Sequence, residues 1–140
     1  MILYAESSAV LSWLLGEPDG PGVLRRLRSA ERVVSSVLTP LECMRGIARS
    51  RAVAGRDDAQ CDEARTLLLH GSVLWFLCEA DANVLHRAAL PFPREPVSTL
   101  DAVHLATILA LRERLGEIAV LTFRGRIREN LEALRVPLAD

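Results

Sequence analysis

The sequence predicts an α/β domain in which helices cover both faces of a central parallel sheet. Short apolar runs rich in β-branched residues alternate with longer segments that begin at capping residues and end at glycine. Strands that alternate with helices form parallel sheets, because each helix carries the chain back to the start of the next strand. Such sheets bind ligands at the carboxyl ends of their strands. The polar residues that follow each predicted strand are therefore the candidates for a functional site.

Apolar runs with the length and composition of strands recur along the chain. The predicted strands cover 1–5, 33–37, 73–77 and 118–122, and 136–138 is a further short candidate. The run at 73–77 is continuous and contains two aromatic residues, so we expect a buried strand there.

The segments between these strands carry start and stop signals of helices. The predicted helices cover 9–15, 21–30, 40–54, 57–69, 81–89, 100–115 and 125–134. Ser7 and Ser8 are candidate caps of the first helix, Thr39 of the third and Thr99 of the sixth. Gly71 is expected to end the fourth helix.

Composition limits the class of protein. The chain has 140 residues, the size of one domain, and half of them are apolar while 25% are charged, as in globular proteins. The net charge of -1 excludes a strongly basic nucleic-acid coat protein but leaves room for a local basic groove. All 17 basic residues are arginine, so no lysine exists for a P-loop or a Schiff base.

Missing motifs exclude further classes. The cysteines form no CxxC pair, which argues against a zinc knuckle and for a reduced cytoplasmic protein; they are Cys43, Cys61 and Cys78. No G-x-G-x-x-G follows the first predicted strand, which argues against a dinucleotide-binding enzyme. No signal peptide and no apolar stretch near ~20 residues is visible, so we expect no membrane contact.

Glu6, Glu42 and Asp101 lie where the predicted sheet opens its ligand-binding edge. Converging carboxylates repel one another unless a cation joins them, and Mg²⁺ or Mn²⁺ prefers such oxygen ligands. A cation bound there can activate water and stabilise a phosphoryl transition state. Acids in first helical turns also interact favourably with the helix dipole, which explains Glu42 and Asp101 equally well. Glu6 directly follows a predicted strand, where we expect no such structural role.

Four blocks of sequence, in this order, resemble a PIN domain, and the nearest type is the VapC toxin of bacterial toxin–antitoxin pairs. The blocks are YAESSAVLSWLLGEP (4–18), LTPLECMRGIAR (38–49), STLDAVHLATILAL (98–111) and VLTFRGRIRENLEALRVPL (120–138). The resemblance implies a single three-layer α/β/α domain over 1–140 with a central parallel sheet. It also implies a divalent-metal-dependent endoribonuclease that uses Mg²⁺ or Mn²⁺, and a VapB-like antitoxin partner. We further expect a homodimer of the toxin.

The resemblance can be carried over residue by residue. Glu6, Glu42 and Asp101 match the first three acids of the family and would hold the cation. Glu6 is one methylene longer than the usual aspartate. Ser8 matches the residue that supports the first acid. The position of the fourth acid holds Arg124.

Arg124 leaves three hypotheses open, because a guanidinium cannot ligate a metal or lose its proton near neutral pH. In the first, three acids hold one cation and Arg124 binds an RNA phosphate. In the second, Arg124 pairs with Glu6 or Asp101 and fills the metal site, which makes the protein a weakly active or non-catalytic PIN-like protein that binds RNA or a partner. In the third, Arg124 points outward and Glu129 replaces the missing acid.

Two further features bear on the site. Arg124, Arg126 and Arg128 form the densest basic stretch near the predicted cleft and are candidate RNA contacts. His104 follows Asp101 by one helical turn, and we expect a buried or bridging histidine beside the acids.

Overall fold

A parallel sheet forms the middle layer of the structure, a computed structural model that describes residues 1–140. Its strands are β1 (Ile2–Ala5), β2 (Arg32–Ser36), β3 (Phe76–Cys78) and β4 (Ile118–Leu121), in the order β3-β2-β1-β4. Tyr4 in the centre of β1 lies opposite Val34 of β2 and Val120 of β4. Every pairing is parallel, which confirms the predicted sheet.

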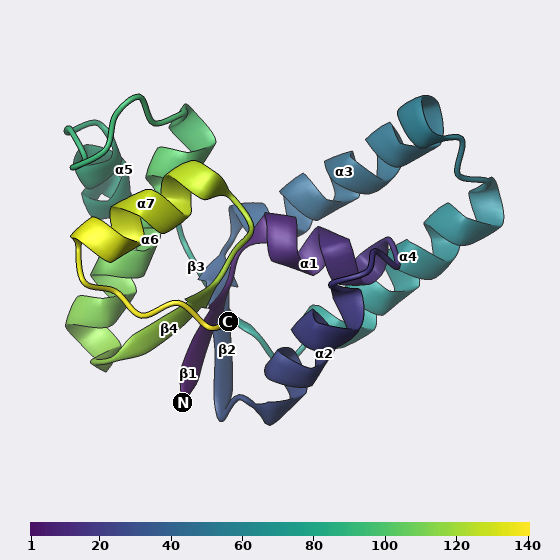
Figure 1. Ribbon diagram of the computed structural model, residues 1–140, viewed down its shortest axis with the longest axis horizontal. Helices are drawn as coiled ribbons and strands as arrows, with labels where there is room; N and C mark the ends of the chain where they lie inside the picture. Colours follow the sequence, from purple (N-terminus) through teal and green to yellow (C-terminus); the bar gives the residue numbers. More distant parts are fainter.

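Helices cover both faces of this sheet (Figure 1). They are α1 (Ser7–Leu14), α2 (Gly20–Ser29), α3 (Leu38–Ala54), α4 (Asp58–Ser72), α5 (Ala82–Ala88), α6 (Thr99–Leu115) and α7 (Gly125–Ala133). α6 and α7 lie on one side and α1 and α2 on the other, while α3 and α4 form a hairpin that projects from the body. This is the predicted three-layer α/β/α arrangement. None of these helices combines the length and the apolar character needed to cross a membrane.

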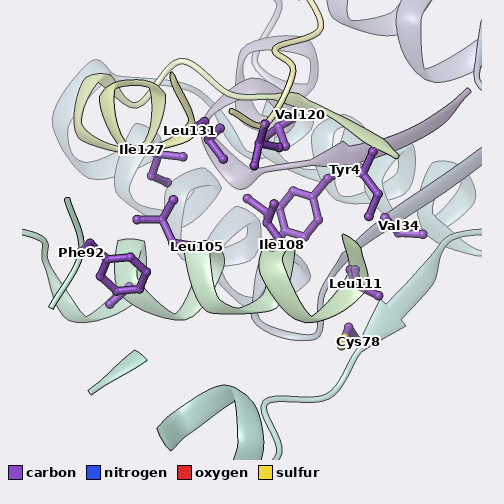
Figure 2. Packing of buried hydrophobic residues seen from close by; sticks show 13 residues of the cluster. Tyr4, Val34, Cys78, Phe92, Leu105, Ile108, Leu111, Val120, Ile127 and Leu131 are labelled. Carbon is purple, nitrogen blue, oxygen red and sulfur yellow. The ribbon is translucent and has the colours of Figure 1, made fainter. Parts of the chain in front are cut away.

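The two faces of the sheet bury alternate residues of the strands, as the two-residue period of a strand requires. Tyr4, Val34 and Val120 point toward α6 and α7, where they join a cluster that includes Leu105 and Ile108 (Figure 2). On the other face, Leu3 and Ala119 pack with Val23 of α2, and Ala5 and Val33 pack with residues of α1, α3 and α4. Both halves of the core thus hold β1 rigidly, and β1 ends at the candidate site.

The region around Gly71 differs from the prediction. α4 continues through Gly71 to Ser72. Gly71 lets the ring of Trp13 approach, because a Cβ there would lie 2.7 Å from its Cη2 atom. The glycine therefore serves close packing and does not end the helix. The strand is shorter than expected, Phe76–Cys78, and forms an edge of the sheet that pairs with β2 alone. Val73 and Leu74 are 74% and 89% exposed, so the expectation of a buried strand over 73–77 was wrong.

The predicted helix caps are displaced by one or a few residues. The carboxylate of Glu6 caps α1, and the Ser98 hydroxyl caps α6 by accepting from the Asp101 N–H. α3 begins at Leu38, whose N–H donates to Ser36 Oγ, while Thr39 is buried. Neighbouring hydroxyl residues are equivalent as local cap signals, so only tertiary packing decides which one is used.

Two remaining segments lie between α5 and α6 and after α7. The proline-rich segment between α5 and α6 contains no helix or strand, as its prolines predict. The short strand expected at 136–138 is reduced to one parallel bridge between Val120 and Leu138.

Candidate functional site

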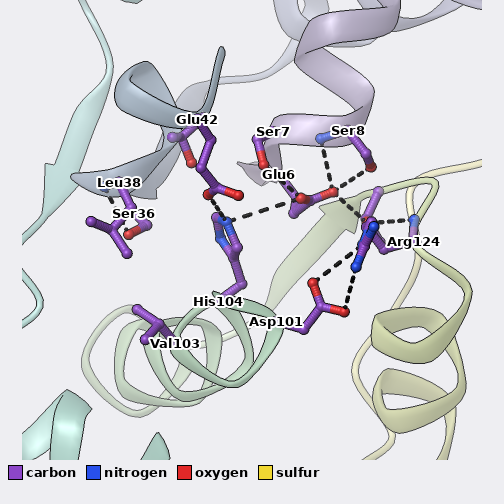
Figure 3. Close-up of polar contacts among 12 residues, drawn as sticks. Glu6, Ser7, Ser8, Ser36, Leu38, Glu42, Asp101, Val103, His104 and Arg124 are labelled. Atoms are coloured by element: carbon purple, nitrogen blue, oxygen red, sulfur yellow. Dashed lines mark hydrogen bonds and ion pairs between the residues drawn. The ribbon is translucent and has the colours of Figure 1, made fainter. Parts of the chain in front are cut away.

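The three predicted acids come together at the carboxyl ends of the strands (Figure 3). Glu6 directly follows β1, Glu42 lies on α3, and Asp101 lies in the first turn of α6. Together with Arg124, which follows β4, they line a cleft of about 940 Å³. The parallel sheet therefore brings residues that lie up to 118 positions apart in the chain to one edge, as the sequence predicts.

Glu6 is buried, with 2% of its surface exposed, and its carboxylate is surrounded by hydrogen-bond donors. Oε2 accepts from the N–H and the hydroxyl of Ser8 and from Thr122 Oγ1, the last at 2.7 Å. Oε1 accepts from Ser7 Oγ at 2.8 Å. These bonds compensate for the burial of a carboxylate. Glu6 also caps α1, so the expectation that this acid has no structural role was wrong.

Ser8 holds two elements together around Glu6. Besides donating to the Glu6 carboxylate, its hydroxyl accepts from the Phe123 N–H at 2.9 Å. Ser8 thus ties the end of β1 to the segment after β4. The role of Ser8 as the support of a cation-binding acid stays a prediction.

Glu42 and His104 form a contact between α3 and α6. The imidazole Nε2 lies 2.6 Å from Glu42 Oε1 and 4.0 Å from Glu6 Oε1. The other ring nitrogen, Nδ1, lies 2.7 Å from the hydroxyl of Tyr4 in β1. His104 is fully buried, which confirms the expected bridging histidine beside the acids.

Arg124 pairs with Asp101. Its Nε donates to Oδ1 at 3.2 Å and its Nη2 to Oδ2 at 3.1 Å, and these bonds raise the pKa of the guanidinium above its ordinary value. The side chain does not point outward, and Glu129 binds Arg126 at 2.9 Å instead of replacing the fourth acid. The geometry therefore excludes the third hypothesis for Arg124.

The other two predicted RNA contacts lie outside the cleft. Arg126 donates to Glu129, and Arg128 donates to the Thr122 carbonyl and to both carboxylate oxygens of Asp140. Neither lines the cleft.

The basic residues that do line the cleft beside Arg124 are Arg45 and Arg49. They follow Glu42 by three and seven positions, a spacing that places all three on one face of α3. This helical spacing from Glu42 could have predicted from the sequence that Arg45 and Arg49 line the cleft.

The donor set fits a divalent cation. Glu6 Oε1, Glu42 and His104 offer ligand atoms that lie within 4.8 Å of one another. Carboxylate oxygens suit Mg²⁺ and Mn²⁺. His104 belongs to this group by distance, but its two ring nitrogens already contact Tyr4 and Glu42.

The cleft continues from the acids into an apolar section. Leu11 of α1, Leu38 and Leu41 of α3, and Leu100 of α6 line it. Leu41 and Leu100 are about half exposed, at 58% and 48%. An exposed apolar surface beside a charged site is typical of a surface that another molecule covers.

Comparisons with known proteins agree with the fold. The model of the PIN domain matches residues 3–129, so the chain belongs to the PIN domain family. The chain is also 32% identical over 132 residues to Ribonuclease VapC46 of Mycobacterium tuberculosis, and the alignment covers 94% of this chain and 92% of that protein. The resemblance to VapC-type PIN proteins is therefore confirmed over nearly the whole length of both chains.

Two solved structures share the fold at low sequence identity. One is FitAB bound to a DNA fragment, with a TM-score of 0.64, 19% identity, and coverage of 99% of this chain and 94% of that chain. The other is VapBC2 of Rickettsia felis bound to a DNA fragment from its promoter, with a TM-score of 0.60, 10% identity, and coverage of 99% and 98%.

Proposed function

We propose that the protein is a VapC-type toxin that hydrolyses phosphodiester bonds of RNA with the help of Mg²⁺ or Mn²⁺. The observation that carries this proposal is the convergence of Glu6, Glu42 and Asp101 in one cleft of a PIN domain. The identity to a protein named a ribonuclease supports it.

The acids would bind the cation, and neighbouring side chains hold their carboxylates in position. Glu6, Glu42 and Asp101 are the residues that would hold the cation, and Ser8 orients Glu6 through its hydroxyl and its N–H. A cation held by these residues would supply an activated water and would offset the charge that develops on the phosphate. Arg124 holds the Asp101 carboxylate through two hydrogen bonds.

Arg124 also has donors left for a substrate. Its Nη1 makes no contact within the protein, and 52% of the side chain is exposed in the cleft. A guanidinium with free N–H groups binds phosphate oxygens well. Arg124 therefore contacts an RNA phosphate while it pairs with Asp101, and Arg45 and Arg49 extend the basic path along α3.

The apolar section of the cleft supports an antitoxin partner. Leu41, Leu100 and Leu11 would contact the apolar face of a VapB-like antitoxin, and the adjacent acids would contact its basic residues. Such a partner would neutralise the toxin by covering the acids. The expected homodimer stays a prediction, which sedimentation of the purified chain would check.

A non-catalytic PIN-like protein remains the alternative that the Arg124–Asp101 pair suggests. The identity to a protein named a ribonuclease does not favour it. In the ribonuclease Asp101 binds the cation, whereas in the non-catalytic protein it only pairs with Arg124. The substitution Asp101→Asn therefore separates the two functions.

The test compares the wild type, Asp101→Asn and the control Glu129→Gln by calorimetric titration of Mn²⁺ and by cleavage of RNA. Asp101→Asn keeps the backbone N–H that donates to the Ser98 hydroxyl and the side-chain oxygen that can accept one bond from Arg124, so it should fold normally. We expect Mn²⁺-dependent cleavage in the wild type and in Glu129→Gln, whose side chain lies outside the cleft, and its loss in Asp101→Asn. Equal behaviour of the wild type and Asp101→Asn would show that catalysis does not use this site.

A further inference from the structure

We propose that His104 is a positioning residue for Glu42, and that Tyr4 holds the imidazole in the tautomer which this role requires. The proposal rests on the proposed function in one respect, the role of Glu42 as a cation-binding acid. It assigns a specific task to two buried residues that do not line the cleft.

Three elements meet in this contact. Tyr4 lies on β1, His104 on α6 and Glu42 on α3, and both Tyr4 and His104 are fully buried. The hydroxyl of Tyr4 lies 2.7 Å from Nδ1, and Nε2 lies 2.6 Å from Glu42 Oε1. The chain of contacts thus runs from the middle of the sheet to the edge of the cleft.

The chemistry of the two end groups decides the direction of these bonds. An ionised carboxylate only accepts, so Nε2 must carry the proton that lies between it and Glu42. In the neutral imidazole Nδ1 is then an acceptor, and the Tyr4 hydroxyl donates to it. The phenolic hydroxyl of Tyr4 is fully buried, and an ordinary phenol keeps its proton near neutral pH, so it can donate to Nδ1.

Glu42 depends on His104 more than the other acids depend on any single partner. Four donors from Ser7, Ser8 and Thr122 hold the Glu6 carboxylate, and the two bonds from Arg124 hold Asp101. The contact with His104 is the one hydrogen bond that the Glu42 carboxylate makes, and 21% of this side chain is exposed.

Loss of His104 would release a carboxylate that has three rotatable side-chain bonds. With Oε1 held by the imidazole, Oε2 stays available to a cation in the cleft. Groups that orient metal ligands in this way typically change metal affinity or activity by 10–100-fold when they are removed.

Calorimetric titration of Mn²⁺ into purified variants tests the proposal. We expect His104→Ala to weaken Mn²⁺ binding by ~10–100-fold. His104→Gln should restore most of the affinity, because its amide nitrogen reaches the position of Nε2 and donates to Glu42. Tyr4→Phe should cause a smaller loss, since the imidazole stays but its tautomer is no longer fixed.

Thr107→Val is the matched control. Thr107 is buried one turn after His104 on α6 and donates only to the Val103 carbonyl, so its replacement disturbs the same helix without touching Glu42. We expect it to leave Mn²⁺ affinity unchanged. If Thr107→Val weakened binding as much as His104→Ala, the effect would be general destabilisation of α6 and the proposal would fail.

Nitrogen-15 NMR of the imidazole gives a readout that does not depend on activity. The wild type should show His104 with its proton on Nε2, before and after saturation with Mg²⁺. A proton on Nδ1, or a shift to Nδ1 when Mg²⁺ binds, would overturn the proposal and make His104 a direct ligand.

Glu42→Gln separates failure of this proposal from failure of the proposed function. If Glu42→Gln loses Mn²⁺ binding while His104→Ala keeps it, Glu42 binds the cation without help and the positioning role is wrong. If both variants bind Mn²⁺ like the wild type, the proposed role of Glu42 itself is wrong.

Discussion

The guanidinium of Arg124 lies against the carboxylate of Asp101, with two parallel hydrogen bonds of 3.2 and 3.1 Å. Paired bonds of this kind fix both groups in one plane. A fixed positive charge therefore stands where the PIN resemblance implies a fourth acid, and it neutralises the third. The edge of the sheet thus presents a smaller net negative charge than four acids would.

Arg124→Asp should separate cation binding from substrate binding. The substitution places a fourth carboxylate beside Asp101, so we expect Mn²⁺ to bind about tenfold more tightly. It also removes a charge-assisted contact to phosphate, so we expect KM for RNA to rise by roughly 10- to 100-fold, in line with ~1.5–3 kcal/mol for such bonds. Calorimetry and RNA cleavage at saturating Mn²⁺ measure the two effects.

Arg126→Asp is the control for this change of charge, because Arg126 lies outside the cleft and pairs with Glu129. It should alter neither quantity appreciably. If Arg124→Asp accelerates cleavage without raising KM, Arg124 is an inactivating residue and not a substrate contact.

Arg45 and Arg49 should contribute to RNA affinity through the phosphate backbone. Each neutralised phosphate lowers the slope of log affinity against log salt by ~0.7 for a single strand. In an Asp101→Asn background, which prevents cleavage, we expect Arg45→Ala and Arg49→Ala each to weaken RNA binding and to make this negative slope shallower by ~0.7.

Arg51→Ala is the matched control on the same helix. Arg51 pairs with Asp58 at the far end of α3 and does not line the cleft. Filter binding at several salt concentrations should show no change of slope for it. An equal change for Arg51→Ala would mean that the effect comes from net charge and not from the cleft.

The sequence predicted the fold because periodicity and strand–helix alternation are properties of long segments. Single residues that usually end a helix or mark a strand were less informative about where the elements begin and end. A glycine at position 71 predicts the end of a helix, but α4 continues through it. The Trp13 ring occupies the space where a side chain of residue 71 would lie. Val73 and Leu74 have the composition of a buried strand but lie beside an edge of the sheet, a position that only the tertiary structure determines.

The site was predictable to the extent that the strand ends were. Glu6 directly follows β1, and Glu42 lies in the first turns of α3, the helix that follows β2. Asp101 lies in the first turn of α6, the helix that leads back to the start of β4, so it begins at the same edge of the sheet. The bonds of His104 to Tyr4 and Glu42 were not predictable, because they join β1, α6 and α3 across long distances in the chain. The pairing of Arg124 with Asp101, and not with Glu6, depends on side-chain geometry in the same way.

Gly20→Ala should destabilise the fold. A Cβ at Gly20 would lie 2.8 Å from the Ser12 carbonyl oxygen and 3.1 Å from the Trp13 Cα, both backbone atoms of α1 that cannot move aside cheaply. We expect a loss of ~1–3 kcal/mol in the free energy of unfolding, measured in urea.

Gly22→Ala provides the contrast within the same helix. The nearest atoms to its Cβ would be the ends of the flexible Arg25 and Arg26 side chains, at 3.6 Å or more. Alanine favours the helix by ~0.5–1 kcal/mol over glycine, so this variant should be stabilised. Equal destabilisation by both substitutions would show that the close approach of α1 and α2 is not the cause.

The buried thiol of Cys43 should make the protein sensitive to alkaline pH. Burial, and then the charge of Glu42, raises its pKa from 9.0 to about 12. Between these values the folded chain keeps a proton that the unfolded chain releases, so the free energy of unfolding falls as pH rises above 9. From pH 8 to pH 10 we expect a fall of ~1 kcal/mol from this group, which urea unfolding measures. Cys43→Ala should remove the fall in stability that this group causes. The thiol of Cys78 also has a raised pKa but is exposed to more solvent, so Cys78→Ala should change the pH dependence less. A wild-type pH dependence in Cys43→Ala would assign the alkaline sensitivity to another group.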